Sequence, residues 1–169
     1  FLLDHGAAID AQDAQGNSAL LLALENGHLE IASMLIHKGA DIHVRNNNQQ
    51  SALHLAGIKG GEKIISLLIC CGAMLNAQDK DGKTVLHIVQ ESKNLELTSL
   101  LLAKNADINI KDYKNQTAIH IAISKKHSAA IDLIQNHSAK QLQRAQRRIQ
   151  FYKEEIALLR QMARLHSKM

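Results

Sequence analysis

The sequence predicts an all-α repeat protein: a solenoid of paired helices, followed by one long C-terminal helix. A residue pattern returns four times at a fixed period of 33 positions. Each copy holds two short runs in which apolar residues recur at helical spacing. Residues 139–168 contain neither Gly nor Pro and consist largely of good helix formers. Paired short helices cannot bury their apolar faces alone, so the copies are expected to stack.

The composition excludes several other classes of protein. Of the 169 residues, 46% are hydrophobic and 21% are charged, which is typical of a globular chain. Aromatic residues make up 2%, too few for a protein that stacks single-stranded nucleic acid on aromatic rings. No apolar run is long enough for a transmembrane helix. The opening FLLDHGAAID lacks the basic and apolar regions of a signal peptide.

The period divides the chain into segments. Residues 1–12 match the tail of a preceding repeat without its first helix, so Leu20, Leu24 and Met34 are expected to be partly uncovered at that end. This start also suggests a fragment of a longer protein. Four repeats follow, and the last one ends where Ser138 and Ala139 replace the Gly-Ala of the earlier copies. The predicted boundaries are 13–45, 46–78, 79–111 and 112–138, with a C-terminal helix over 139–169.

Within each repeat, a hydroxyl residue precedes the first apolar run, where it can cap a helix N-terminus. These residues are Ser18, Ser51, Thr84 and Thr117. A second run, represented by Ile31, Met34 and Leu35, predicts the partner helix. Gly39 and Gly72 follow such runs, at the position where a helix end needs a positive φ. Turns rich in Gly, Asn and Asp separate successive repeats.

This pattern, [ST]-x-[LI]-[LH]-x-[AV] followed by LL-x-x-G-A-D-[IV], resembles the ankyrin repeat across residues 1–137. The resemblance implies helix pairs with hairpin-like loops and a slightly concave face that binds protein partners. The chain departs from the family pattern at several positions. Alanine or valine replaces the usual proline after each capping residue, and Leu21 replaces the motif histidine. Lys93-Asn94 replaces Gly-His between two helices, and Asn105 replaces a hairpin glycine.

Three histidines, His54, His87 and His120, recur at the repeat period. Stacked helices lie about 8–10 Å apart, whereas Zn–N bonds are about 2.0–2.1 Å long. Equivalent histidines therefore cannot share one ion, and we interpret them as motif residues that hydrogen-bond to the local backbone. No phosphate-binding loop, metal-ligand cluster or nucleophile with an oriented base is present in the sequence. We predict a non-enzymatic chain with no cofactor, no metal and no catalytic residues.

The ankyrin register implies a set of partner-binding residues on the hairpins and first helices. They are amide-rich in the middle of the array and basic toward its C-terminal end. Tyr113 is the predicted anchor, because exposed tyrosine is enriched in binding hot spots. The predicted residues are Gln15, Asn17, Glu25, Arg45, Asn48, Gln50, Lys80, Lys83, Glu91, Lys111, Tyr113, Lys114 and Lys125.

The excess positive charge is confined to the predicted C-terminal helix. Residues 139–169 hold eight Lys or Arg against two Asp or Glu, while residues 1–138 hold 12 against 14. A heptad-like seam begins at Leu142 and Ala145 and continues through the predicted oligomerisation residues Ile149, Tyr152, Ile156, Leu159 and Ala163. A second apolar column contains Phe151, Leu158, Met162 and Leu165. Three roles stay open: capping the last repeat, pairing with another helix, or contacting acidic lipid or nucleic acid.

The leading hypothesis is a scaffold or adaptor that binds a protein partner on the concave face, with self-association through the C-terminal helix as a possibility. A regulatory segment of a kinase, ion channel or pathogen effector is an alternative, as is a basic helix that binds nucleic acid or acidic membrane; both of these ligands are less favoured. Cys70 and Cys71 are adjacent and unsuited to a mutual disulfide. Their small number fits the cytoplasm or nucleus, or the host cytosol for an effector.

Overall fold

The structure is a computed structural model that describes residues 8–59 and 61–166, with side chains described as far as residue 159. The chain divides into two compact units, Phe1–Leu133 and Ile134–Met169. Within the described residues the structure is helical, apart from one isolated antiparallel bridge between Arg45 and Ser51. The all-α prediction is therefore confirmed.

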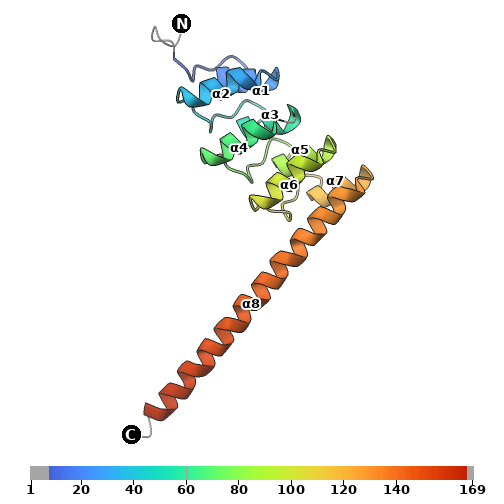
Figure 1. The fold of residues 1–169 in the computed structure, drawn as a ribbon. Coiled ribbons are helices and arrows are strands. Elements are labelled where there is room, and N and C mark those ends of the chain that lie inside the picture. The colour runs from blue at the N-terminus through green and yellow to red at the C-terminus, as the bar shows by residue number, and fades with distance from the viewer. Residues whose placement is uncertain (1–7, 60, 167–169) are drawn as a thin grey trace. The chain divides into compact units, whose positions relative to one another are not determined.

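The first unit consists of helix pairs stacked in two layers (Figure 1). The inner layer contains α1 (Ala19–Glu25), α3 (Ala52–Lys59), α5 (Val85–Glu91) and α7 (Ala118–Ser124). The outer layer contains α2 (Leu29–His37), α4 (Glu62–Cys70) and α6 (Leu95–Ala103). Each of α1, α3 and α5 contacts both its own outer helix and the next inner helix, so the two layers enclose one continuous core.

The core of the stack is built from residues that recur at the repeat period. Leu20, Leu53 and Leu86 occupy the same repeat position, and each is at most 1% exposed. Small residues pack where neighbouring inner helices approach closely. At Gly57, an added Cβ would lie 2.8 Å from Cγ2 of Val85, so α3 and α5 could not pack this closely around a larger side chain. The periodicity read from the sequence is thus the periodicity of the core.

The expectation for the N-terminal end of the stack is partly wrong. Leu20 and Leu24 are fully buried, because α1 packs against both α2 and α3 and these side chains lie within that contact. Met34, in contrast, is 51% exposed on α2, as expected. Ile31, on the same helix, is 48% exposed. In this repeat the outer helix presents the more exposed apolar side chains, while Leu22 on the inner helix α1 is 38% exposed.

The predicted helix signals are found where the sequence placed them. Ser18 Oγ accepts a hydrogen bond from the Leu21 amide at 3.4 Å. Thr84 and Thr117 form capping boxes at the starts of α5 and α7. Asn105 adopts φ 64°, which confirms that this asparagine takes the left-handed position of the missing glycine.

The last helix, α8 (Ser128–His166), is 39 residues long and begins inside the fourth repeat. As expected from the loss of the Gly-Ala signal, the second helix of this repeat runs on without interruption. The predicted helix of 139–169 is therefore the continuation of a repeat helix, and residues 167–169 lie outside the described residues. Residues 1–7 of the predicted truncated repeat also lie outside them. Among the described helices, none has the length and apolar character that crossing a bilayer requires.

Candidate partner-binding surface

Four hairpin loops line one side of the stack, and each begins with the same side-chain turn. Asp13, Asn46, Asp79 and Asp112 each accept hydrogen bonds through Oδ1 from the amides two and four residues ahead, over 2.8–3.0 Å. Asp and Asn favour such turns because their short side chains reach the backbone nearby. The predicted turns rich in Gly, Asn and Asp are therefore found, and Asp79 and Asp112 help to form them.

The loops are joined to one another through their backbones. The amide of Asn47 donates to the carbonyl of Gln15 at 2.9 Å, and that of Lys80 donates to Asn48 at 2.9 Å. The amide of Tyr113 donates to the carbonyl of Asp81 at 3.0 Å. Gln78 adds a side-chain link, because its Nε2 donates to the carbonyl of Lys111 at 3.0 Å. One backbone hydrogen bond between each two successive loops therefore holds the loop tips in register along the stack.

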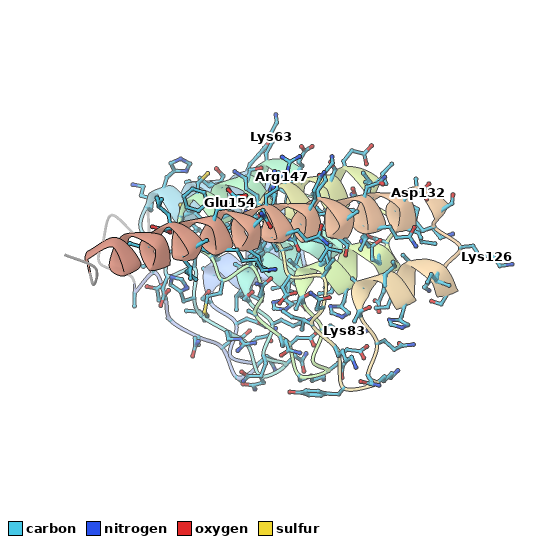
Figure 2. All side chains as sticks on the ribbon, turned by 90° about the horizontal axis from the view of Figure 1, so that it is seen from below. Lys63, Lys83, Lys126, Asp132, Arg147 and Glu154 are labelled. Carbon is cyan, nitrogen blue, oxygen red and sulfur yellow. The ribbon has the colours of Figure 1, made fainter. Side chains whose placement is uncertain are left out.

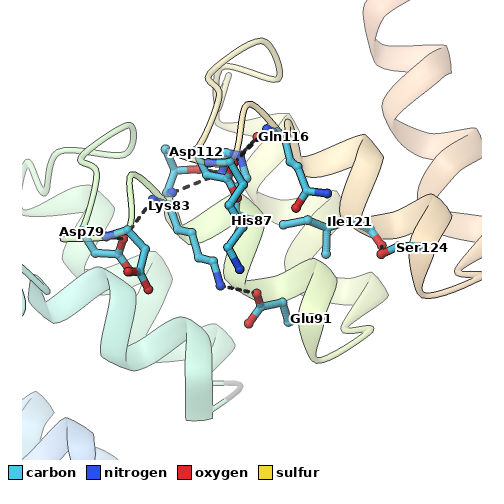
Figure 3. A network of polar contacts seen from close by, with 11 residues as sticks. Asp79, Lys83, His87, Glu91, Asp112, Gln116, Ile121 and Ser124 are labelled. Carbon is cyan, nitrogen blue, oxygen red and sulfur yellow. Dashed lines mark hydrogen bonds and ion pairs between the residues drawn. The ribbon is translucent and has the colours of Figure 1, made fainter.

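Two of the motif histidines also connect successive repeats. Nδ1 of His87 accepts from the Thr84 amide at 3.2 Å and lies 2.8 Å from Thr84 Oγ1, while Nε2 donates to the Gln116 carbonyl at 3.1 Å. His54 makes the equivalent contacts with Ser51 and with the Lys83 carbonyl. The predicted local hydrogen bonds are confirmed, but the bridge to the next repeat was not foreseen. Figure 3 shows His87 beside Gln116, its partner in the next repeat.

Burial sets the charge of these rings. It lowers the pKa of His54 and of His87 below the ordinary value for histidine, and the carbonyl acceptors oppose this only in part. Both rings are 1% exposed, so they are neutral near pH 7. The third motif histidine, His120, makes only the local contact with Thr117 and is exposed.

An ion pair lies beside this network. Nζ of Lys83, in the third hairpin, lies 2.5 Å from Oε1 of Glu91 at the end of α5 (Figure 3). The hydrogen bond that Lys83 donates to Glu91 raises the pKa of the lysine, so it stays charged. Figure 2 shows Lys83 on the hairpin side of the stack and Lys63 on the opposite side, where the outer helices lie.

The predicted partner-binding residues fall into three groups by exposure. Asn17 is buried and does not reach the surface, which corrects its assignment. Arg45, Gln50 and Lys83 are half-buried, and Arg45 is held by hydrogen bonds to the carbonyls of Gln49 and Gln78. The remaining predicted residues are exposed: Gln15, Glu25, Asn48, Lys80, Glu91, Lys111, Tyr113, Lys114 and Lys125.

A family model described as ankyrin repeats, in three copies, matches residues 1–79 and 53–145. The chain belongs to the ankyrin-repeat family. Ankyrin repeats are generally protein–protein interaction modules and are typically non-enzymatic. No curated protein sequence matches the chain closely enough to count as a relative. Within the described part of the ankyrin array and its extension, no group of three His, Cys, Asp or Glu side chains could hold a metal ion.

Among the described large hydrophobic side chains of the ankyrin array, Tyr113 is the most exposed, at 76%. Its ring lies over the preceding hairpin: an added Cβ at Gly82 would be 2.7 Å from Tyr113 Cδ1. The glycine therefore leaves room for the ring against the preceding hairpin. The role of Tyr113 as an anchor stays a prediction.

The sequence reading missed an apolar member of this ankyrin surface. Ile58 occupies the same repeat position as Glu25 and Glu91 and is 47% exposed at the end of α3. Its spacing of 33 residues from both glutamates is the signal that could have found it. The grooves between outer helices were also not predicted. One of them, between α2 and α4, is lined by Leu29, Glu30, Ser33, Lys63, Ile64 and Leu67.

The predicted oligomerisation residues lie on α8. Ile149, Tyr152, Ile156 and Leu159 are between 49% and 58% exposed, and Leu142 is 61% exposed. The ring of Phe151 contacts that of Tyr152 edge to face, with centroids 5.9 Å apart. The side chain of Ala163 lies outside the described residues.

Proposed function

We propose that the chain is a scaffold or adaptor whose hairpin surface binds an acidic segment of a partner protein. The hairpin surface consists of the loops 13–17, 46–50, 79–83 and 112–116 with the C-terminal ends of the inner helices. The observation that carries the proposal is the lysine cluster at the fourth repeat. Lys111, Lys114, Lys125 and Lys126 are exposed, and none has an ion pair among the described residues.

The surface also contains fixed features that a partner can contact. Its loops are held in register by backbone hydrogen bonds, so little ordering entropy is lost on binding. Tyr113 provides a rigid aromatic surface beside the lysines, and Ile58 provides an apolar one. Anchors of this kind supply most of the binding energy in protein interfaces, while surrounding charges favour partners of opposite sign.

A peptide-display selection on the intact chain tests this proposal. We expect the selected peptides to be enriched in Asp and Glu and to bind about tenfold more weakly to the variant K111E/K114E. The matched control is K63E/K104E, which makes the same charge change on the outer layer, where both lysines are exposed. Selection without acidic enrichment would contradict the proposal. So would an equal loss in both variants, because that would reflect net charge alone.

The second part of the proposal concerns the C-terminal helix, which we assign to self-association, with capping of the last repeat as the alternative. Five large apolar side chains on one seam are exposed in the helix, and their burial against another helix is favourable. Light scattering on the full chain should give a dimer or larger species, and I149D/I156D should give a monomer. The control Q143D/Q150D places the same acids on the polar face. A monomeric parent chain that loses stability in I149D/I156D would support capping instead.

A further inference from the structure

The charges beside the seam of α8 indicate how two copies would pair. Leu142, Ile149 and Ile156 occupy the first core position of the heptad, and Ala145, Tyr152 and Leu159 the second. Arg148 and Glu155 then lie at the same flanking position, one heptad apart, each directly before a first core residue. Flanking positions set partner choice and orientation in helix pairs.

Neither of these two charges is neutralised within its own helix. The residues three and four positions from Arg148 are Arg144, Ala145, Phe151 and Tyr152, so no carboxylate is in reach. The same positions around Glu155 are all aromatic or leucine. No ion pair of either residue is found within the described part of the chain. Both charges are therefore available to a second helix.

We propose that α8 pairs antiparallel with α8 of a second copy, with the two-fold axis between Ile149 and Tyr152. This inference rests on the self-association proposed above and adds its orientation and register. In this arrangement Arg148 of each copy lies beside Glu155 of the other, which gives two attractive pairs. A parallel pair would instead contain two contacts between Arg148 of one copy and Lys153 of the other. Their repulsion offsets the attraction between Glu155 and the arginine at position 160.

The neighbouring antiparallel registers are disfavoured by the same charges. A shift of one heptad in one direction brings Glu155 beside Glu155 of the second copy and Lys153 beside Lys153. A shift in the other direction brings Arg148 beside Arg148. Like charges that face each other across a helix pair are destabilising. Of these three registers, the proposed one alone has attraction without repulsion.

The seam residues agree with the antiparallel register. Ile149 faces Tyr152 of the second copy, Ala145 faces Ile156, and Leu142 faces Leu159. Each layer then contains either two large residues or one large and one small. A parallel pair would stack Ala145 on Ala145 and Tyr152 on Tyr152, and so would place a thin layer beside a wide one. Uniformly filled layers avoid the cavities that destabilise cores.

The second apolar column supports the same orientation. Phe151 and Leu158 lie on the side of the seam that carries Arg148 and Glu155, and both are exposed. Antiparallel pairing places this side of both copies together, so the four apolar side chains flank the two ion pairs. Partial exclusion of water strengthens such pairs relative to fully exposed ones. In a parallel pair the two columns would lie on opposite sides.

The charge reversal R148E separates the orientations. In the antiparallel pair it creates two contacts between glutamates, and we expect the dimer dissociation constant to rise about tenfold. In a parallel pair it would place Glu opposite Lys153, and the dimer would tighten. The double variant R148E/E155R restores two opposite-charge pairs and should recover the parent affinity. The control R147E makes the same change at the neighbouring arginine, which points away from the seam, and should have little effect.

Circular dichroism checks that R148E still folds. We expect its helix content to be unchanged, because the new glutamate lies four residues after Arg144 and favours the helix. Cross-linking gives a second, independent measurement of orientation. In a C70S/C71S background, the single variants A145C and I156C should form a disulfide only when mixed. A disulfide in A145C alone, or a tighter dimer in R148E, would overturn the antiparallel assignment while leaving self-association intact. A monomeric parent chain would overturn both proposals.

Discussion

The first repeat and the two that follow it hold their neighbours in different ways. In the second and third repeats, a buried histidine caps its own helix and donates a hydrogen bond to the next hairpin. In the first repeat, Leu21 occupies that position, is 1% exposed and offers only apolar contact. The same stacking is thus compatible with either solution. The hydrogen bond from the histidine is directional and depends on pH, whereas the apolar contact of the leucine has neither property.

Removal of a bridge should have the largest effect on stability. H87A deletes a buried ring and leaves a cavity and an unpaired Thr84 hydroxyl, so we expect the free energy of unfolding to fall by about 2–3 kcal/mol. Urea unfolding measures this. H120A removes the local cap without a bridge and should cost about 1 kcal/mol. Equal losses in the two variants would show that the bridge to the next repeat adds nothing.

Acidification should act on the same two repeats. The folded pKa values of His54 and His87 are lowered, so the unfolded chain binds more protons as the pH falls below about 6.5. The contribution of His54 and His87 to the free energy of unfolding is therefore fully present above that pH. It is lost as the pH falls through their pKa values in the folded state. We expect the urea midpoint to drop between pH 7.5 and pH 5. The non-titrating variant H54Q/H87Q should show a flatter profile, and an unchanged slope would contradict this account.

The repeats also differ in the turn between their paired helices. Here the first repeat has the residue better suited to a positive φ. Gly27 adopts φ 76°, whereas Lys93 and Lys126 adopt φ 55° and 54° in the third and fourth repeats. A left-handed conformation is costly for a residue with a Cβ. K93G and K126G should therefore each raise the free energy of unfolding by about 0.5–1 kcal/mol. G27K should lower it by a similar amount. Thermal unfolding of the three variants checks these signs.

The ion pair on the hairpin surface should have the smallest effect. Lys83 and Glu91 are partly exposed, with side-chain exposures of 22% and 43%, so solvent screens their attraction. We expect E91Q to cost at most about 0.5 kcal/mol, and less at high salt. A loss well above that of E25Q, the same change at the same position of the first repeat, would assign the pair a structural role.

The fold could be predicted because the repeat period, the capping residues and the turns are local signals that occur four times. The bridge from His87 to Gln116 could not, because it joins residues from different repeats and depends on how closely these stack. The burial of Asn17 was missed for a related reason. Its register position placed it in the predicted partner-binding set, but its amide donates to Asp13 Oδ1 and its side chain is buried within the loop.

The sequence predicted which positions lie on the candidate surface, but not which side chains there remain available to a partner. Arg45 was assigned to a partner by register, but its guanidinium is already bound to two carbonyls of the array. Ile58 was missed because apolar residues on a helix are normally assigned to the core. Which side chains are occupied internally depends on contacts about one repeat away, which the sequence does not display.

The backbone hydrogen bonds between successive hairpin loops affect how this surface can change during evolution. Gln15, Asn48 and Asp81 accept through their carbonyls, and the amides that donate to them are equally independent of side-chain identity. Substitutions at the loop tips can therefore alter which molecules are recognised without dismantling the scaffold beneath. Insertions are different, because one added residue in a loop would displace its amide and carbonyl from their partners in the neighbouring loops. Adaptation of this surface is expected to proceed by replacement of residues at constant repeat length.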